Sequence, residues 1–250
     1  MQKTIAEYFE LSGRDTRSRM TVHFDPEVKE FVRLISALTT LLGRFNAAKP
    51  QYEKDSPYHA AFGLMTKGAN TLGAAFELSL SGYLWEPPAL LRVALETFAV
   101  AWDIVHNPKR FQTWKVDKKF DSTSSISNAK EVNDAIGKLN GLLSKMNIHI
   151  SPLNSSPAMF QADQPKFQLF GLIQPVKENI RQPEIYLSLF VTLICLQLTE
   201  LTFYQYAECL ETIQILPDGT GAQNRVSETH KVFVKEMKSV FQLLAEGKIE

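Results

Sequence analysis

The stretch that decides the fold reads PPALLRVALETFAVAWDIVH and runs from Pro87 to His106. Apolar residues cover nearly every side of the helix that it predicts, which is typical of a central, buried helix. Its charged residues are Arg92, Glu96 and Asp103. Arg92 and Glu96 are four residues apart, and Asp103 lies about 20° from Arg92 in helical projection. These three residues, the polar stripe, therefore share one face of the helix.

Two interpretations of the polar stripe remain open. Buried charges are costly unless they are paired, so the stripe can be an internal ion-pair network that fixes the helix register. It can instead line a cleft and present Arg92 to an anion. Two carboxylates beside an arginine would also suit a metal ion. No third or fourth ligand is identifiable in the sequence, so we predict neither a metal site nor a cofactor.

The rest of the chain predicts more helices around this one. Asp25-Pro26 and Ser56-Pro57 each open a long helix, because Asp and Ser cap well and proline is favoured at the first helical position. Glycines recur in the second of these, which predicts close approach of a neighbouring helix there; they are Gly63, Gly68 and Gly73. The predicted helices cover residues 3–11, 26–49, 57–83, 87–106, 128–147, 170–180, 183–215 and 223–245.

Loops are predicted at the serine-rich residues 121–127 and at residues 151–168, which are rich in Ser, Pro, Asn and Gln. No segment alternates apolar and polar residues as a strand would. The sequence therefore predicts an all-α protein, an antiparallel helical bundle with long core helices. We expect an N-terminal arm with a short helix over residues 1–25 and a single bundle domain over residues 26–250.

Composition narrows the classes of function. The chain has 250 residues, with 27 basic and 27 acidic side chains, so the overall positive field of a non-specific nucleic-acid binder is absent. Cys195 and Cys209 fall in one predicted helix about 21 Å apart, too far for a disulfide. Unpaired thiols, the absence of a signal-peptide pattern and the lack of a long apolar segment predict a cytoplasmic protein that does not enter a membrane.

Two further features are candidates for binding or chemistry. His149 follows a predicted helix end, where it can cap the helix or act as an acid or base near neutral pH. A basic segment follows Pro108 and contains Lys109, Arg110 and Trp114. An aromatic ring among basic residues could hold a nucleic-acid backbone and stack a base. The alternative is a solvated connector, a short helix whose aromatic side chains dock on the core.

The pattern around these features resembles bacterial helical families related to the HEPN (higher-eukaryote and prokaryote nucleotide-binding) superfamily. The resemblance rests on the sequence LLRVALE around Arg92 and Glu96, on Asn107-Pro108, on Trp114, and on the later helix end at Ser144 to His149. It covers roughly residues 71–205. It implies a helical bundle that can form homodimers, in a superfamily with many RNA-cutting toxins and antiviral defence proteins and also members without known activity.

The resemblance guides the assignment of site residues. We predict Arg92, Glu96 and His149 as the catalytic residues. Arg92 would bind phosphate, Glu96 would orient the Arg92 side chain, and His149 would act as the acid or base. The substrate-binding residues predicted beside them are Asp103, Lys109, Arg110 and Trp114.

The nuclease members of the superfamily carry an Arg followed by His after four to six residues. Arg17 to His23 and Arg225 to His230 have this spacing, but Arg17 lies in the arm, and Arg225 and His230 are about 140° apart on a helix.

Two functions therefore follow from the sequence. One is an RNA-directed or nucleotide-binding protein in a defence or stress system. The other is a non-catalytic helical module that acts as a homodimer or with a protein partner. No P-loop, GxGxxG, CxxC pair, HExxH or GxSxG motif occurs, which argues against the common kinds of nucleotide hydrolysis, redox cofactor use and serine hydrolysis.

Overall fold

The computed structural model of the protein describes residues 14, 17–18, 20–22, 25–48, 56–81, 83, 86–116, 120–132, 134–147, 160–161, 164–167 and 211. Nearly all of these residues are helical, which confirms the all-α prediction. The predicted helices at residues 3–11, 170–180 and 223–245 lie outside the described residues. So do His149, both cysteines, and residues 183–215 apart from Glu211.

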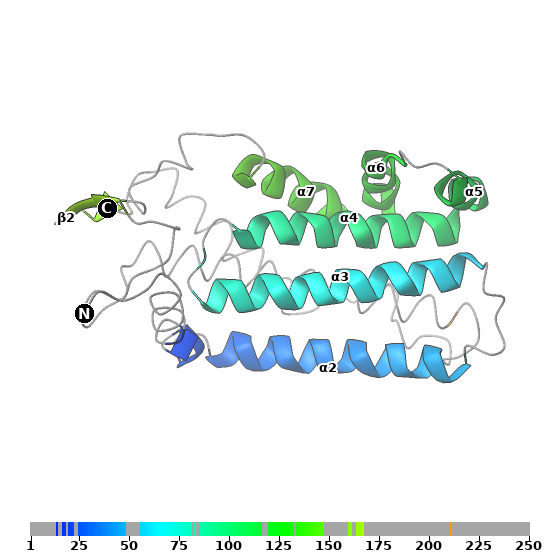
Figure 1. Cartoon of the computed structure of the whole chain (residues 1–250). Coiled ribbons are helices and arrows are strands. Elements are labelled where there is room, and N and C mark those ends of the chain that lie inside the picture. The colour runs from blue at the N-terminus through cyan, green and yellow to red at the C-terminus, as the bar shows by residue number, and fades with distance from the viewer. Residues whose placement is uncertain are drawn as a thin grey trace.

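Three long helices lie side by side and form the body of the fold (Figure 1). They are α2 (Asp25–Ala48), α3 (Pro57–Leu80) and α4 (Glu86–His106). The predicted cap of α3 is confirmed, since the hydroxyl of Ser56 accepts a hydrogen bond from the backbone N–H of His59 at 3.2 Å. A cap fixes where α3 begins, and prolines stand at the starts of α2, α3 and α4, so these helices match their predicted ranges closely.

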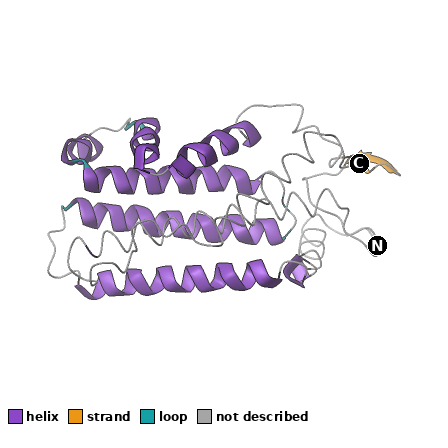
Figure 2. Ribbon diagram, turned by 180° about the vertical axis from the view of Figure 1, so that it is seen from behind, coloured by secondary structure: helices purple, strands orange, loops and turns teal. Residues whose placement is uncertain are grey.

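Three shorter helices cover the side of α4 that faces away from α3, as Figure 2 shows from behind. They are α5 (Pro108–Val116), α6 (Ser122–Val132) and α7 (Asp134–Asn147). Each of them contacts α4, which also packs along α3. Because helices pack on both sides of α4, its apolar residues are buried, among them Leu91, Ala94, Phe98 and Ile104. The prediction that α4 is the central helix is confirmed.

The serine-rich segment was predicted as a loop, and that prediction is wrong. Residues 122–127 form the first half of α6, and the helix predicted over 128–147 is two helices, α6 and α7. Serine disfavours helix interiors because its hydroxyl competes for backbone groups. Here that competition is resolved by packing: Ser125 and Ile126 are buried against the core. Asn128, predicted at a helix start, lies inside α6.

A short antiparallel hairpin lies within residues 151–168, the second predicted loop. Strand β1 (Phe160–Gln161) pairs with β2 (Gln164–Phe167).

Among the helices of the described residues, none is long and apolar enough to cross a membrane.

Two pairs of stacked phenylalanine rings join α2 to α3. Phe31 and Phe76 have ring centroids 3.8 Å apart with planes at 14°, and Phe45 and Phe62 have centroids 3.5 Å apart at 10°. All four side chains are buried. The pairs lie toward opposite ends of the two helices, so they fix both the spacing and the register of α2 on α3.

The expected role of the α3 glycines holds at one position among the described residues. A Cβ on Gly68 would overlap the ring of Phe98 in α4, whereas a Cβ on Gly63 or Gly73 meets no described atom within 4 Å. Gly68 is thus the residue that lets α3 and α4 approach closely.

Replacing Gly68 by alanine is expected to lower the free energy of unfolding by about 1 to 3 kcal/mol, because the buried ring of Phe98 must shift. Gly73→Ala is the matched control. With open space around its Cβ, it should raise stability by about 0.5 to 1 kcal/mol through better helix propensity. Urea denaturation of both variants measures the difference, and equal effects of the two substitutions would contradict the assignment.

Candidate functional site

The first half of the polar stripe is a half-buried ion pair on α4. Nε of Arg92 donates to Oε1 of Glu96 at 2.9 Å, and the two side chains are 28% and 30% exposed. The other carboxylate oxygen, Oε2, accepts a hydrogen bond from the hydroxyl of Ser122 at 3.1 Å. Helical spacing brings Arg92 to Glu96, and the packing of α6 on α4 brings Ser122. Glu96 is therefore held from two elements.

Arg92 has hydrogen-bonding capacity that the described residues leave unused. Its Nη1 is buried, and no described residue accepts a hydrogen bond from it. Leaving such a donor unsatisfied costs about 1 to 3 kcal/mol. Native proteins have few such groups, so this one requires an explanation.

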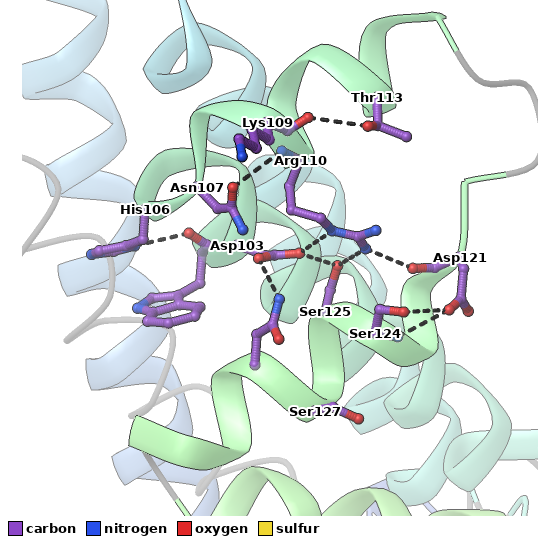
Figure 3. Close-up of polar contacts among 12 residues, drawn as sticks. Asp103, His106, Asn107, Lys109, Arg110, Thr113, Asp121, Ser124, Ser125 and Ser127 are labelled. Carbon is purple, nitrogen blue, oxygen red and sulfur yellow. Dashed lines mark hydrogen bonds and ion pairs between the residues drawn. The ribbon is translucent and has the colours of Figure 1, made fainter.

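The second half of the polar stripe is a buried cluster that links three helices (Figure 3). Asp103, 1% exposed, accepts hydrogen bonds from Nε of Arg110 at 2.8 Å, from the hydroxyl of Ser125 at 2.7 Å and from the side-chain amide of Asn128 at 2.9 Å. Arg110 belongs to α5, and Ser125 and Asn128 belong to α6. These four residues, the Asp103 cluster, hold α5 and α6 on α4.

The guanidinium of Arg110 makes further contacts in and beside this cluster. Its Nη2 donates to the backbone carbonyl of Asp121 at 2.8 Å and to the hydroxyl of Ser125 at 3.0 Å. Its Cζ also lies 4.2 Å from the centroid of the Phe120 ring. Asp103 and Arg110, both predicted to bind substrate, are thus placed in an internal ion pair. The polar stripe divides into this buried cluster and the half-buried pair of Arg92 and Glu96.

The basic segment is the predicted short helix, α5, and its aromatic side chains dock inward. Phe111 is buried, and Trp114 is half-buried and packs against the core. Lys109 is exposed at the start of the helix. Lys115 lies with Nζ 5.6 Å from the centroid of the Phe111 ring. Among the predicted binding residues, Lys109 is exposed and Trp114 is half-buried, whereas Asp103 and Arg110 are paired with each other.

An open groove of about 360 Å³ lies beside Glu96. Its walls come from α3, α4, α5 and the start of α6, and it is lined by Leu64, Val93, Glu96, Thr97, Val100, Trp114, Phe120 and Ser122. The groove brings together Glu96 and Trp114, which the sequence predicted as site residues on separate helices. His149, the third predicted catalytic residue, lies outside the described residues.

Sequence reasoning missed Ser122, Ser125 and Asn128, because it placed the first two in a loop. A signal was present: the three residues recur every third position, so on a helix they lie near one face. Within the described residues, no group of three or more His, Cys, Asp and Glu side chains is arranged to hold a metal ion.

Asp121 caps the N-terminus of α6. Its carboxylate accepts hydrogen bonds from the hydroxyl of Ser124 and from the backbone N–H groups of Thr123 and Ser124. The hydrogen bond from the Ser124 hydroxyl, followed by that from the Thr123 backbone, lowers the pKa of Asp121 below its usual value. The cap thus favours the ionised carboxylate.

Stability should depend on the ionisation of this cap. Because the folded pKa is lowered, the contribution of Asp121 is present above the unfolded pKa of about 3.9 and is lost as pH falls through the folded value. Asp121→Ala should lower stability at pH 7, and its difference from the wild type should shrink in acid. Asp121→Asn keeps a capping oxygen and serves as the control that does not titrate. Urea denaturation from pH 7 to pH 2.5 tests this; a difference that stays constant over that range would contradict it.

Comparison of the chain with models of known protein families, with characterised proteins and with solved structures found no match.

Proposed function

We propose that the protein is a HEPN-like antiparallel helical bundle that acts on RNA or binds a nucleotide in a cytoplasmic defence or stress system. The observation that carries this proposal is the buried Nη1 of Arg92, for which no described residue is an acceptor. Arginine binds phosphate oxygens well, since its planar fork offers several donors. With its Nε paired to Glu96, Arg92 keeps the far end of that fork for a phosphate. Its side chain is 28% exposed, so a ligand can reach part of it.

Each predicted residue has a role in this scheme. Arg92 binds the phosphate and stabilises the charge that develops on it. Glu96, 2.9 Å from Nε of Arg92, orients the guanidinium. His149 supplies the acid or base, a role that remains a prediction. Lys109 and Trp114 contact the substrate, while Asp103 and Arg110 hold α5 and α6 in place for them.

The test is RNA cleavage by the purified protein, or growth arrest on its expression, in the wild type and in Arg92→Ala and His149→Ala. We expect both substitutions to reduce activity by at least about 100-fold, as is typical when a charge-stabilising group or a general acid is removed. Arg44→Ala, an exposed arginine of α2, is the matched control and should keep full activity. Full activity in both Arg92→Ala and His149→Ala would refute this function.

A second candidate is a non-catalytic interaction module that works as a homodimer or with a protein partner. The Asp103 cluster favours it, because there the charges of α4 serve internal packing. In that case Arg92→Met combined with Glu96→Leu should fold and keep its partner, since well-packed apolar residues can replace an ion pair. If this double variant folds but abolishes a measured RNA-directed activity, the interaction module is excluded. Sedimentation or light scattering gives the oligomeric state.

A further inference from the structure

The groove beside Glu96 combines a wall of apolar side chains with a polar edge. Trp114 and Phe120 supply aromatic rings, Leu64, Val93 and Val100 supply aliphatic surface, and Glu96, Thr97 and Ser122 supply oxygen atoms. Such a mixture suits a planar ring that stacks on the wall and makes hydrogen bonds along one edge. The shape alone does not choose among planar ligands, but the charges around the groove do.

The charges at the groove disfavour an ionised ligand of either sign. An anion would meet the carboxylate of Glu96, which lines the groove. An organic cation would find that carboxylate already paired with Arg92 at 2.9 Å. It would also find the guanidinium of Arg110 already lying 4.2 Å from the centroid of the Phe120 ring. The portion of a ligand inside the groove should therefore be neutral.

The free hydrogen-bonding capacity of Glu96 selects the edge of that ligand. Each carboxylate oxygen has about two acceptor sites. Oε1 uses one for Arg92, and Oε2 uses one for Ser122. Among the described residues, one acceptor site on each oxygen remains, a pattern that fits two adjacent N–H donors in a bidentate arrangement. Among the common bases, guanine alone presents two neighbouring donors, its ring N1–H and its 2-amino group, whereas each of the others sets its donor beside an acceptor.

We infer that the groove is a binding site for a guanine base, which stacks on Trp114 and donates from N1–H and its 2-amino group to Glu96. This inference rests on the proposed function and gives it a substrate class: guanine nucleotides, or RNA with an unpaired guanine. Arg92 lies four residues before Glu96 on α4, outside the lining of the groove, and is the residue proposed above to bind the phosphate. Specificity comes from the base and affinity is shared between base and phosphate.

The test uses the nucleosides guanosine, inosine, adenosine and cytidine, which lack phosphate, with binding measured by calorimetry on the full chain. Guanosine should bind at least about tenfold more tightly than adenosine or cytidine. Inosine, which lacks the 2-amino group, should bind about tenfold more weakly than guanosine because one hydrogen bond is lost. Equal affinities for guanosine and adenosine, or no binding of guanosine to the folded protein, would overturn the inference.

Two variants test the hydrogen bonds to Glu96 separately from the stacking on Trp114. Glu96→Gln should remove the preference for guanosine, because an amide cannot accept at both positions. Trp114→Leu keeps an apolar side chain but removes the ring. It should weaken the binding of guanosine about 5- to 150-fold, which is the usual contribution of stacking on an aromatic residue. Glu77→Gln, an exposed carboxylate of α3 paired with Arg17, is the control. Unchanged guanosine binding in Glu96→Gln would refute the site.

The outcomes for the groove and for the proposed function are distinguishable. Guanosine carries no phosphate, so its binding does not require Arg92. Selective binding of guanosine with no RNA cleavage and no growth arrest would retain the guanine site and reject the RNA-directed activity. Cleavage that depends on Arg92 but shows no guanosine binding would do the reverse.

Discussion

Asp103→Ala is expected to lower the free energy of unfolding by about 3 to 5 kcal/mol, because it breaks a buried ion pair by removing one partner. The carboxylate is 1% exposed and its partner Arg110 is 20% exposed. Its loss leaves the guanidinium without its counter-charge, and it leaves the donors of Ser125 and Asn128 without an acceptor. Urea denaturation at pH 7, followed by far-ultraviolet circular dichroism, measures the change.

The control for Asp103→Ala is an ion pair of similar geometry at the surface. Lys29 and Asp25 lie 2.6 Å apart on α2 with side chains 75% and 51% exposed, so Lys29→Ala should cost less than about 1 kcal/mol. In a double-mutant cycle, Asp103→Ala and Arg110→Ala together should cost clearly less than the sum of the two single effects. A loss for Asp103→Ala no larger than that for Lys29→Ala would show that the cluster does not hold the helices.

The second large effect is expected at the junction of α2 and α3. Phe76→Ala should cost about 3 to 5 kcal/mol, the usual range for a buried phenylalanine. Phe76 is 3% exposed and stacks on Phe31, so the substitution removes both core volume and an aromatic contact between the helices. Thermal and urea denaturation give the size of the loss.

Two comparisons assign that loss to the junction. Val32 of α2 is 56% exposed, so Val32→Ala should change stability by less than about 0.5 kcal/mol. Phe31→Ala and Phe76→Ala should be coupled in a double-mutant cycle by about 0.5 to 1.5 kcal/mol, the contribution of an aromatic pair beyond its burial. Additive effects of the two substitutions would mean that the rings do not stabilise each other.

The sequence predicted the long helices well because their ends carry strong local signals. Ser56-Pro57 opens α3 and Asn107-Pro108 separates α4 from α5. Such signals act within a few residues, so no knowledge of the fold is needed to use them. The first half of α6 lacks the apolar periodicity that the long helices show. Its serines favour a loop by composition, and the contacts that override this preference come from α4 and α5.

The candidate site was predictable to the extent that helical periodicity governs it. The pair of Arg92 and Glu96 follows directly from a spacing of four residues. Asp103 pairs with Arg110, which lies seven residues later in the next helix, α5. The helical periodicity of α4 does not extend past Asn107-Pro108, so it could not predict this pair. The contacts of Ser122 with Glu96 and of Asn128 with Asp103 span 26 and 25 residues and depend on packing alone.

The Asp103 cluster has a consequence for the groove that it does not line. Trp114, Phe120 and Ser122 form one side of the groove, and they belong to or adjoin α5 and α6. The cluster fastens these helices to α4 through hydrogen bonds that share the carboxylate of Asp103. We therefore expect α5 and α6 to open together as one unit of local unfolding. By thermodynamic linkage, any molecule held in the groove also holds this unit closed, and a substitution at Asp103 weakens that molecule's binding without touching it.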